Sequence, residues 1–205
     1  IVLDRAAASI QKILQQLEEK TKINSTEKKD IQARIKFTAN IDDCRAALII
    51  EAIVEKLDIK TDLFLQLAAI NSTECILASN TSSLSIDAIQ QQLPNPERVA
   101  GLHFFNPAHL MKLVEVVRAK QTNETVIQSL VSFCKQLNKT PVLCIDSPGF
   151  IVNRVARHYY LEAMRLVQEQ QIPFETIDRI MESSGFKMGP FKLMDMIGMD
   201  INLAV

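Results

Sequence analysis

One histidine and one glutamate stand alone in two neighbouring apolar stretches. His103 lies near the carboxyl end of residues 99–105, and Glu115 lies in the β-rich residues 112–117, after a break at Asn106-Pro107. We expect two strands that place an imidazole beside a carboxylate at the rim of a sheet. A carboxylate fixes the tautomer of imidazole and stabilises the imidazolium, which makes a general base that works near neutral pH. The alternative is a buried histidine bonded to backbone and a glutamate on an edge strand.

A second polar group follows another apolar run. Residues 75–79 predict a buried strand, which opens directly into Asn80-Thr81-Ser82-Ser83. Hydroxyl and amide side chains at the carboxyl end of a parallel strand lie where ligands bind in open α/β sheets. Capping of the next helix by Ser83 or Ser85 accounts for one serine, but not for four consecutive polar residues.

The chain begins with residues 1–4, which read as the end of a strand closed by Asp4. An acid that ends the second strand of a dinucleotide-binding unit accepts hydrogen bonds from the adenosine ribose and selects NAD over NADP. The signal is not specific, because many strands end in an aspartate that forms a turn.

Strands and helices alternate up to residue 147. The apolar patterns predict strands at 34–38, 46–53, 75–79, 99–105, 112–117 and 140–146, and helices at 6–20, 25–33, 57–70, 86–92 and 123–137. This alternation predicts a doubly wound α/β sheet. Residues 46–53 are almost continuously apolar, which is typical of a strand buried on both faces.

From residue 150 onward the patterns predict helices only, at 150–170, 173–184 and 189–198. The first is apolar on most of its surface, as a helix buried between two domains would be. We place the boundary at residue 147, so the expected domains are 1–147 and 148–205. Both are expected to be incomplete, the first at its start and the second at its end.

Composition narrows the function classes. Among 205 residues the net charge is −1, which gives no electrostatic reason to expect nucleic acid or an anionic membrane as partner. The four cysteines are far apart and lack metal-ligand spacing, so we expect reduced thiols, a cytoplasmic protein and no metal. No apolar run reaches the ~18 residues that span a bilayer.

Taken together, six ordered segments resemble the L-3-hydroxyacyl-CoA dehydrogenase family, including the 3-hydroxybutyryl-CoA dehydrogenases. The resemblance is far more specific than any one motif, and it extends over most of residues 46–198. The segments are Ile50-Glu-Ala-Ile-Val-Glu55, Ala78-Ser-Asn-Thr-Ser-Ser-Leu84, Gly101-Leu-His-Phe-Phe-Asn-Pro107, Met111-Lys-Leu-Val-Glu115, Asp146-Ser-Pro-Gly-Phe-Ile-Val-Asn-Arg154 and Met188-Gly-Pro-Phe191.

The resemblance implies a Rossmann-like domain followed by an all-α domain, and NAD-dependent oxidation of (S)-3-hydroxyacyl-CoA to 3-oxoacyl-CoA. By position, His103 would be the base that takes the proton of the 3-hydroxyl, and Glu115 would orient it and stabilise its charged form. Ser82 would hydrogen-bond the reacting oxygen near the nicotinamide, and Asn153 would help to position the substrate.

The resemblance also implies residues that bind the cofactor and an oligomeric state. Glu55, Lys60 and Asn106 match positions that border NAD in the family, and Asp4 matches the acid that binds the ribose. The implied partner is an acyl-CoA substrate, and a homodimer through the helical domain is expected.

The sequence departs from the family at the phosphate-binding turn. The family opens with a glycine-rich GxGxxG turn that holds the pyrophosphate, whereas no glycine precedes Gly101 here. Either the sequence is part of a longer enzyme, which we favour, or the protein lacks its phosphate loop and is inert. Two other functions stay open: a dehydrogenase of a hydroxy acid or sugar acid without CoA, and a non-catalytic relative of the crystallin kind.

Overall fold

The computed structural model describes residues 2–204. It divides into two compact units between Arg45 and Ala46. The predicted boundary at residue 147 concerns the second of these units and stays a prediction.

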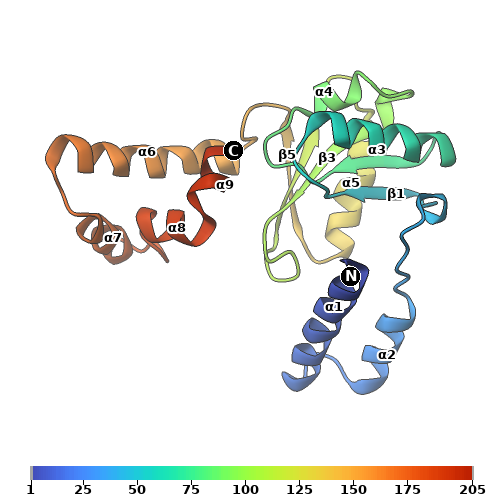
Figure 1. Cartoon of the computed structure of the whole chain (residues 1–205), viewed down its shortest axis with the longest axis horizontal. Helices are drawn as coiled ribbons and strands as arrows, with labels where there is room; N and C mark the ends of the chain where they lie inside the picture. The colour runs from blue at the N-terminus through green and yellow to red at the C-terminus, as the bar shows by residue number, and fades with distance from the viewer. Residues whose placement is uncertain (1, 205) are drawn as a thin grey trace. The chain divides into compact units, whose positions relative to one another are not determined.

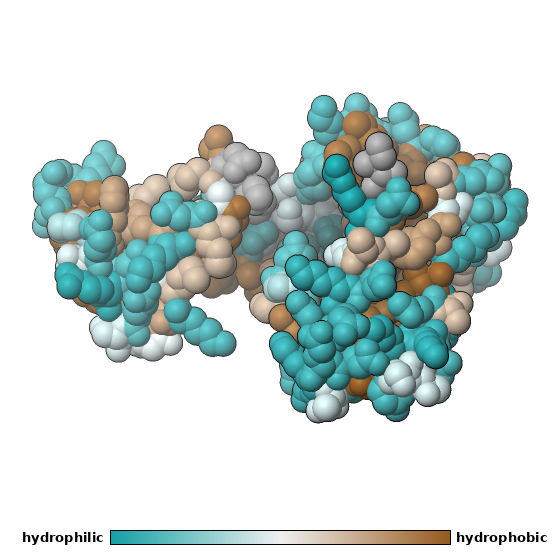
Figure 2. All heavy atoms as spheres, turned by 60° about the horizontal axis from the view of Figure 1, so that its bottom comes forward, coloured by the Kyte–Doolittle hydropathy of each residue, from teal (hydrophilic) through white to brown (hydrophobic). Residues whose placement is uncertain are grey.

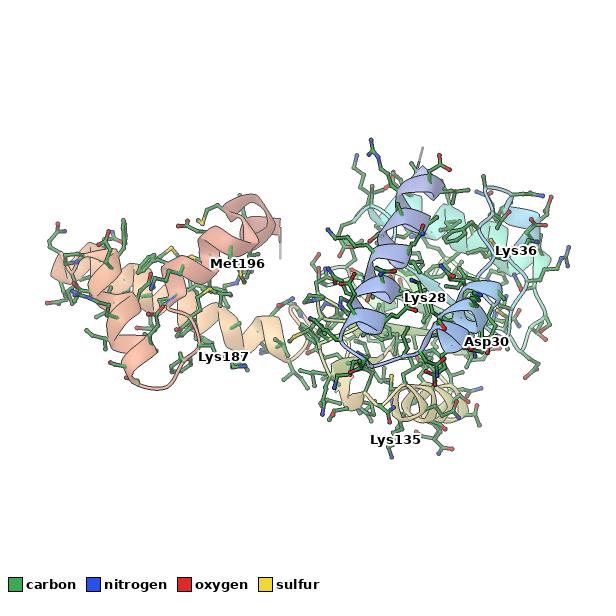
Figure 3. The ribbon with its side chains drawn as sticks, turned by 90° about the horizontal axis from the view of Figure 1, so that it is seen from below. Lys28, Asp30, Lys36, Lys135, Lys187 and Met196 are labelled. Carbon is green, nitrogen blue, oxygen red and sulfur yellow. The ribbon has the colours of Figure 1, made fainter. Side chains whose placement is uncertain are left out.

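The first unit contains helices α1 (Val2–Glu19) and α2 (Ser25–Ala33) and the 3-10 turn η1 (Ile41–Asp43). Asn24 and Glu27 cap the start of α2. The Asn24 side chain accepts hydrogen bonds from the Thr26 and Glu27 amides, both at 2.9 Å, and the Glu27 carboxylate accepts from the Asn24 amide at 2.8 Å. Between the two helices, Lys28 forms an ion pair of 2.7 Å with Glu18 (Figure 3).

Two predicted strands of this unit are wrong. Asp4 lies in the first turn of α1, and Ile1, the first residue of that predicted strand, lies outside the described residues. Residues 34–38 form no strand either. An extended segment needs a neighbouring strand for its backbone hydrogen bonds, whereas a helix satisfies its own. After residue 34, Thr38 and Asn40 instead bond to nearby backbone and side chains, as turn-forming residues do.

The second unit begins with a mixed sheet and is the α/β fold that the sequence predicts. Within the described residues the strand order is β1-β2-β3-β4-β5, with β3 and β4 antiparallel and the other neighbours parallel. The strands are β1 (Leu48–Glu51), β2 (Ile76–Ser79), β3 (Val99–Phe104), β4 (Leu113–Arg118) and β5 (Thr140–Ile145). The helices between them are α3 (Leu57–Ile70), α4 (Ile86–Gln90), η2 (Pro96–Arg98) and α5 (Glu124–Gln136).

The helices cover opposite faces of this sheet, with α3 and α4 on one side and α5 on the other (Figure 1). Right-handed crossovers require this, because β4 and β5 run opposite to β1, β2 and β3. Leu102 and Val116 face α5 and pack against Leu130 in the main apolar core. Since side chains alternate along a strand, His103 and Glu115 lie on the other face, where α3 and α4 pack.

The expectation for β1 is wrong in one respect. It forms an edge of the sheet in the described residues, and Ile50 is 38% exposed, so the strand is not buried on both faces. Glu51, the polar residue of this strand, is instead the buried one, at 3% exposure. A buried carboxylate in an apolar strand needs partners, and these belong to the site described below.

After β5 the chain is helical, as predicted, but its first helix is not buried on most of its surface. Ala163 is its one buried residue in the structure described, whereas Val155 is 67% exposed. Apolar atoms are visible among polar ones on this segment (Figure 2). The helices are α6 (Val152–Gln170), α7 (Phe174–Ser183), α8 (Pro190–Ile197) and α9 (Met199–Ala204). None of the described helices is long and apolar enough to span a membrane.

Gly101 allows β3 and β4 to approach closely, and replacing it tests that constraint. A Cβ atom at this position would lie 2.7 Å from the Val117 Cβ and 3.1 Å from the Ile86 Cδ1. We expect Gly101→Ala to lower the free energy of unfolding in urea by about 1–3 kcal/mol, because the two strands must separate. The exposed Ser129→Ala on α5 is the control, and an equal effect of both variants would contradict the argument.

Candidate active site

His103 and Glu115 form a buried pair across β3 and β4. The antiparallel register sets the two residues opposite each other, and His103 Nδ1 lies 2.7 Å from Glu115 Oε2. His103 is 7% exposed and Glu115 is 1% exposed. The predicted imidazole–carboxylate pair is therefore present, and the alternative of a histidine bonded to backbone is wrong.

The second oxygen of Glu115 binds the start of α6. Oε1 accepts hydrogen bonds from the backbone amides of Ile151 at 3.0 Å and Val152 at 2.8 Å. The first amides of a helix lack partners within the helix and favour an anion. Burial raises the pKa of Glu115, but the hydrogen bonds from His103 and from these amides outweigh it and hold the pKa below its usual value. The carboxylate is therefore ionised at neutral pH.

This arrangement selects one tautomer and one orientation of the His103 ring. An ionised carboxylate only accepts hydrogen bonds, so Nδ1 carries the proton and Nε2 of the neutral ring keeps a free electron pair. The ring centroid lies 4.6 Å from that of Phe105 and 5.9 Å from that of Phe150. Within the described residues no hydrogen bond to Nε2 occurs, so this nitrogen is available to a ligand.

A cleft of about 190 Å³ lies beside the pair, within the second unit. Its lining combines His103 with Ser82 from the loop after β2, Asn106 from the loop after β3 and Asn153 from α6. The Asn153 side chain donates a 3.4 Å hydrogen bond to the Ser82 carbonyl. Four of the residues singled out in the sequence thus surround one cavity, although they lie far apart along the chain.

A buried ionic network supports the polar loop after β2. The Lys60 ammonium lies 2.6 Å from Glu51 Oε1 and 3.2 Å from Glu55 Oε2, and Lys60 is 1% exposed. Glu51 Oε2 accepts a 2.7 Å hydrogen bond from the Ser79 hydroxyl at the end of β2. The cation is therefore enclosed by two carboxylates, as a buried lysine requires.

Glu55 connects this network to the loop. Its Oε1 accepts hydrogen bonds from the Thr81 hydroxyl, from the Ser82 amide at 3.1 Å and from the Ser83 amide at 3.2 Å. Burial raises the pKa of Glu55, but bonds from Thr81 and Lys60 hold it below the usual value. Lys60 is thus too buried to line the cleft, and its influence on Ser82 passes through Glu55.

The position of Asp4 differs from the one that the sequence suggested. It lies in a helix of the first unit, so the strand position that suggested a ribose site is absent. The ribose role of Asp4 therefore rests on the resemblance alone.

Three residues that contribute to the cleft or to its supporting contacts were not found from the sequence: Glu51, Phe150 and Arg157. Glu51 carried the same signal as His103, namely one ionisable group in an apolar strand, and could have been found by it. Phe150 follows Gly149, and both have positive φ, of 45° and 71°. No sequence signal marks Arg157, which lines the cleft from the face of α6.

The chain is similar to known proteins in sequence and in structure. Residues 2–147 match the family description "3-hydroxyacyl-CoA dehydrogenase, NAD binding domain", and residues 149–205 match its "C-terminal domain". The chain is 52% identical over 161 residues to the 3-hydroxyadipyl-CoA dehydrogenase of Escherichia coli, covering 78% of this chain and 34% of that protein. It is 42% identical over 205 residues to a probable 3-hydroxybutyryl-CoA dehydrogenase of Deinococcus radiodurans, covering 99% and 73%.

A solved structure is also similar to this chain. The crystal structure of 3-hydroxybutyryl-CoA dehydrogenase from Escherichia coli matches with a TM-score of 0.95 and 44% identity, over 98% of this chain and 43% of that one. The chain spans about a third to a half of several curated relatives, since it also covers 49% of the mitochondrial hydroxyacyl-coenzyme A dehydrogenase of Sus scrofa.

Removal of the buried cation tests the network around Lys60. We expect Lys60→Met to lower the free energy of unfolding by about 3–5 kcal/mol, because two carboxylates lose their counter-ion. Urea unfolding measures the loss, and the exposed Lys56→Met is the matched control. The further variant Glu51→Gln/Lys60→Met should recover part of the loss; no recovery would contradict the ionic explanation.

The depressed pKa of Glu115 predicts a pH-dependent contribution to stability. Between the folded and unfolded pKa values the unfolded state binds more protons, so stability rises with pH there. The contribution is complete above the unfolded value, about 4.3, and is lost as pH falls through the folded value. We expect the difference in unfolding free energy between wild type and Glu115→Gln to shrink below about pH 4.3.

Urea unfolding from pH 7 to pH 3 measures this difference. The exposed Glu162→Gln is the control for removal of one carboxylate. A difference between wild type and Glu115→Gln that stays constant over the whole range would contradict the assignment.

Proposed function

The chain belongs to the 3-hydroxyacyl-CoA dehydrogenase family, and from that premise we propose that it oxidises (S)-3-hydroxyacyl-CoA to 3-oxoacyl-CoA with NAD. One observation carries the proposal: an imidazole held by an ionised carboxylate lines a cleft beside the hydroxyl and amide groups of Ser82 and Asn153. An acyl-CoA thioester is the substrate class that the relatives' names support.

NAD is the cofactor of the family's N-terminal domain, so the predicted cofactor is confirmed at the level of the family. The residues present fit its nicotinamide end, because Ser82 and Asn106 follow the carboxyl ends of β2 and β3 and line the cleft of His103. Glu55 would hold the loop of Ser82 in place. When bound, NAD accepts the hydride that leaves C3 of the substrate.

The proton follows a separate path in this proposal. His103 Nε2 accepts the proton of the 3-hydroxyl, and the ring becomes an imidazolium whose charge faces Glu115 at 2.7 Å. The Ser82 hydroxyl donates a hydrogen bond to the reacting oxygen, and Asn153 positions the substrate. Loss of one proton and one hydride converts the 3-hydroxyl to a 3-oxo group.

The Glu115 carboxylate favours this step because it does not need to move. Two helix amides and the imidazole already orient it, so its charge is in place before the imidazolium forms. A non-catalytic relative would not require a histidine with a free nitrogen at a cleft, so this feature supports an enzyme. The homodimer, implied by the resemblance, and the cytoplasmic location, expected from the cysteines, stay predictions.

Substitution of the base tests the proposed function. We expect His103→Gln to lower kcat by about 10²- to 10⁴-fold while the protein stays folded, because a general base contributes that much. The assay follows loss of NADH absorbance with acetoacetyl-CoA, using the protein that carries this chain. The exposed loop variant His109→Gln is the control, and near-normal turnover by His103→Gln would refute the base assignment.

A further inference from the structure

Helix α6 contributes a single face to the cleft. The residues are Asn153, Ala156, Arg157 and Tyr160, whose spacing of three, four and seven places them on one side of a helix. Asn153 is bonded to the loop of Ser82, at the reacting end. Arg157 lies one turn farther along, about 6 Å by the rise of an α-helix. The cleft therefore has a reacting end and, next to it, a cationic end.

The charge of Arg157 has no counter-ion in the part of the chain that the structure describes. Its Nη1 donates a 3.2 Å hydrogen bond to the carbonyl of Asn202, and no ion pair involves it. By contrast, the half-buried Arg118 pairs with Glu124, and the exposed Arg165 pairs with Glu169. A half-buried guanidinium with five donors and one carbonyl partner retains most of its capacity to bind an anion.

We propose that Arg157 forms a subsite for a carboxylate at the far end of the acyl chain, so that the preferred substrates are 3-hydroxyacyl-CoA thioesters of dicarboxylic acids. This inference rests on the proposed function. A guanidinium binds a carboxylate through two parallel hydrogen bonds, which gives both affinity and orientation. The methylene groups of the chain would lie against Ala156 and Ile197, which line the same cleft.

The size of the substrate agrees with one helical turn. In a 3-hydroxyadipyl group the distal carboxylate is three carbon–carbon bonds from C3, and the arginine side chain spans the remaining distance. The relative from Escherichia coli that is 52% identical is named a 3-hydroxyadipyl-CoA dehydrogenase. A phosphate of CoA is a poorer occupant, because it is separated from C3 by the whole pantetheine chain while Arg157 shares the cleft of His103.

Binding of two substrate analogues tests the subsite without turnover. Adipyl-CoA and hexanoyl-CoA differ in the distal carboxylate and lack the reactive hydroxyl. We expect calorimetry to give a Kd for adipyl-CoA at least about 10-fold lower, since a charged hydrogen-bonded pair contributes that much. Arg157→Gln should abolish the difference and leave the Kd for hexanoyl-CoA within about 3-fold of wild type.

Two further variants separate charge from structure. Arg157→Lys keeps the charge but not the planar pair of donors, so it should retain part of the preference. Arg165→Gln removes an arginine from the same helix outside the cleft and should retain all of it. Circular dichroism verifies that each variant is folded. If Arg157→Gln weakens both analogues equally, Arg157 has only a structural role through Asn202, and the subsite is refuted.

Turnover of 3-hydroxyhexanoyl-CoA and 3-hydroxyadipyl-CoA with NAD distinguishes this inference from the proposed function. Turnover of both thioesters with equal Kd for the two analogues would refute the subsite and leave the dehydrogenase function standing. An Arg157-dependent preference for adipyl-CoA without any turnover would support the subsite and refute the function. We expect turnover of both, with a kcat/KM at least about 10-fold higher for the adipyl substrate that falls to parity in Arg157→Gln.

Discussion

The site depends on one carboxylate that binds three donors. Glu115 receives a hydrogen bond from His103 on β3 and two from the backbone at the start of α6, so a single side chain of β4 connects two strands to the first helix of the helical segment. Each donor lowers the cost of burying the charge, and the buried charge in turn orients the imidazole. The same interaction therefore positions the candidate base and holds the start of α6, a helix that lines one side of the cleft. Loss of the carboxylate would affect both at once.

A second ionic network supports the site from the neighbouring strands. Lys60 is neutralised by Glu51 and Glu55, and Glu55 holds the amides of Ser82 and Ser83. The Lys60–Glu51 pair is buried, whereas the Glu55 side chain is 35% exposed. Buried charges need partners, and the two networks hold the loop of Ser82 and the start of α6, where Asn153 lies. Both networks thus support the part of the cleft that His103 and Ser82 line, whereas Arg157 has one carbonyl partner.

Several of these features could be predicted from single residues. His103 and Glu115 were recognisable because one is the only histidine and the other the only acid of an apolar stretch, and a short connection makes such strands antiparallel neighbours. Glu51 had the same signal, yet its partner Lys60 lies in a helix, where a lysine looks like an ordinary surface residue. The strands expected at residues 1–4 and 34–38 were wrong because β propensity without a neighbouring strand leaves backbone groups unpaired.

The sequence by itself determined the order of strands and helices after residue 46, the family, and four of the residues that line the cleft. These follow from local periodicity and from short segments, which depend on neighbours along the chain. Only the tertiary structure decided that Glu115 binds the amides of Ile151 and Val152, 36 and 37 residues away, and that Arg157 shares a cleft with His103. Hydrogen bonds and clefts between distant residues depend on how the elements pack, and no local pattern records that packing.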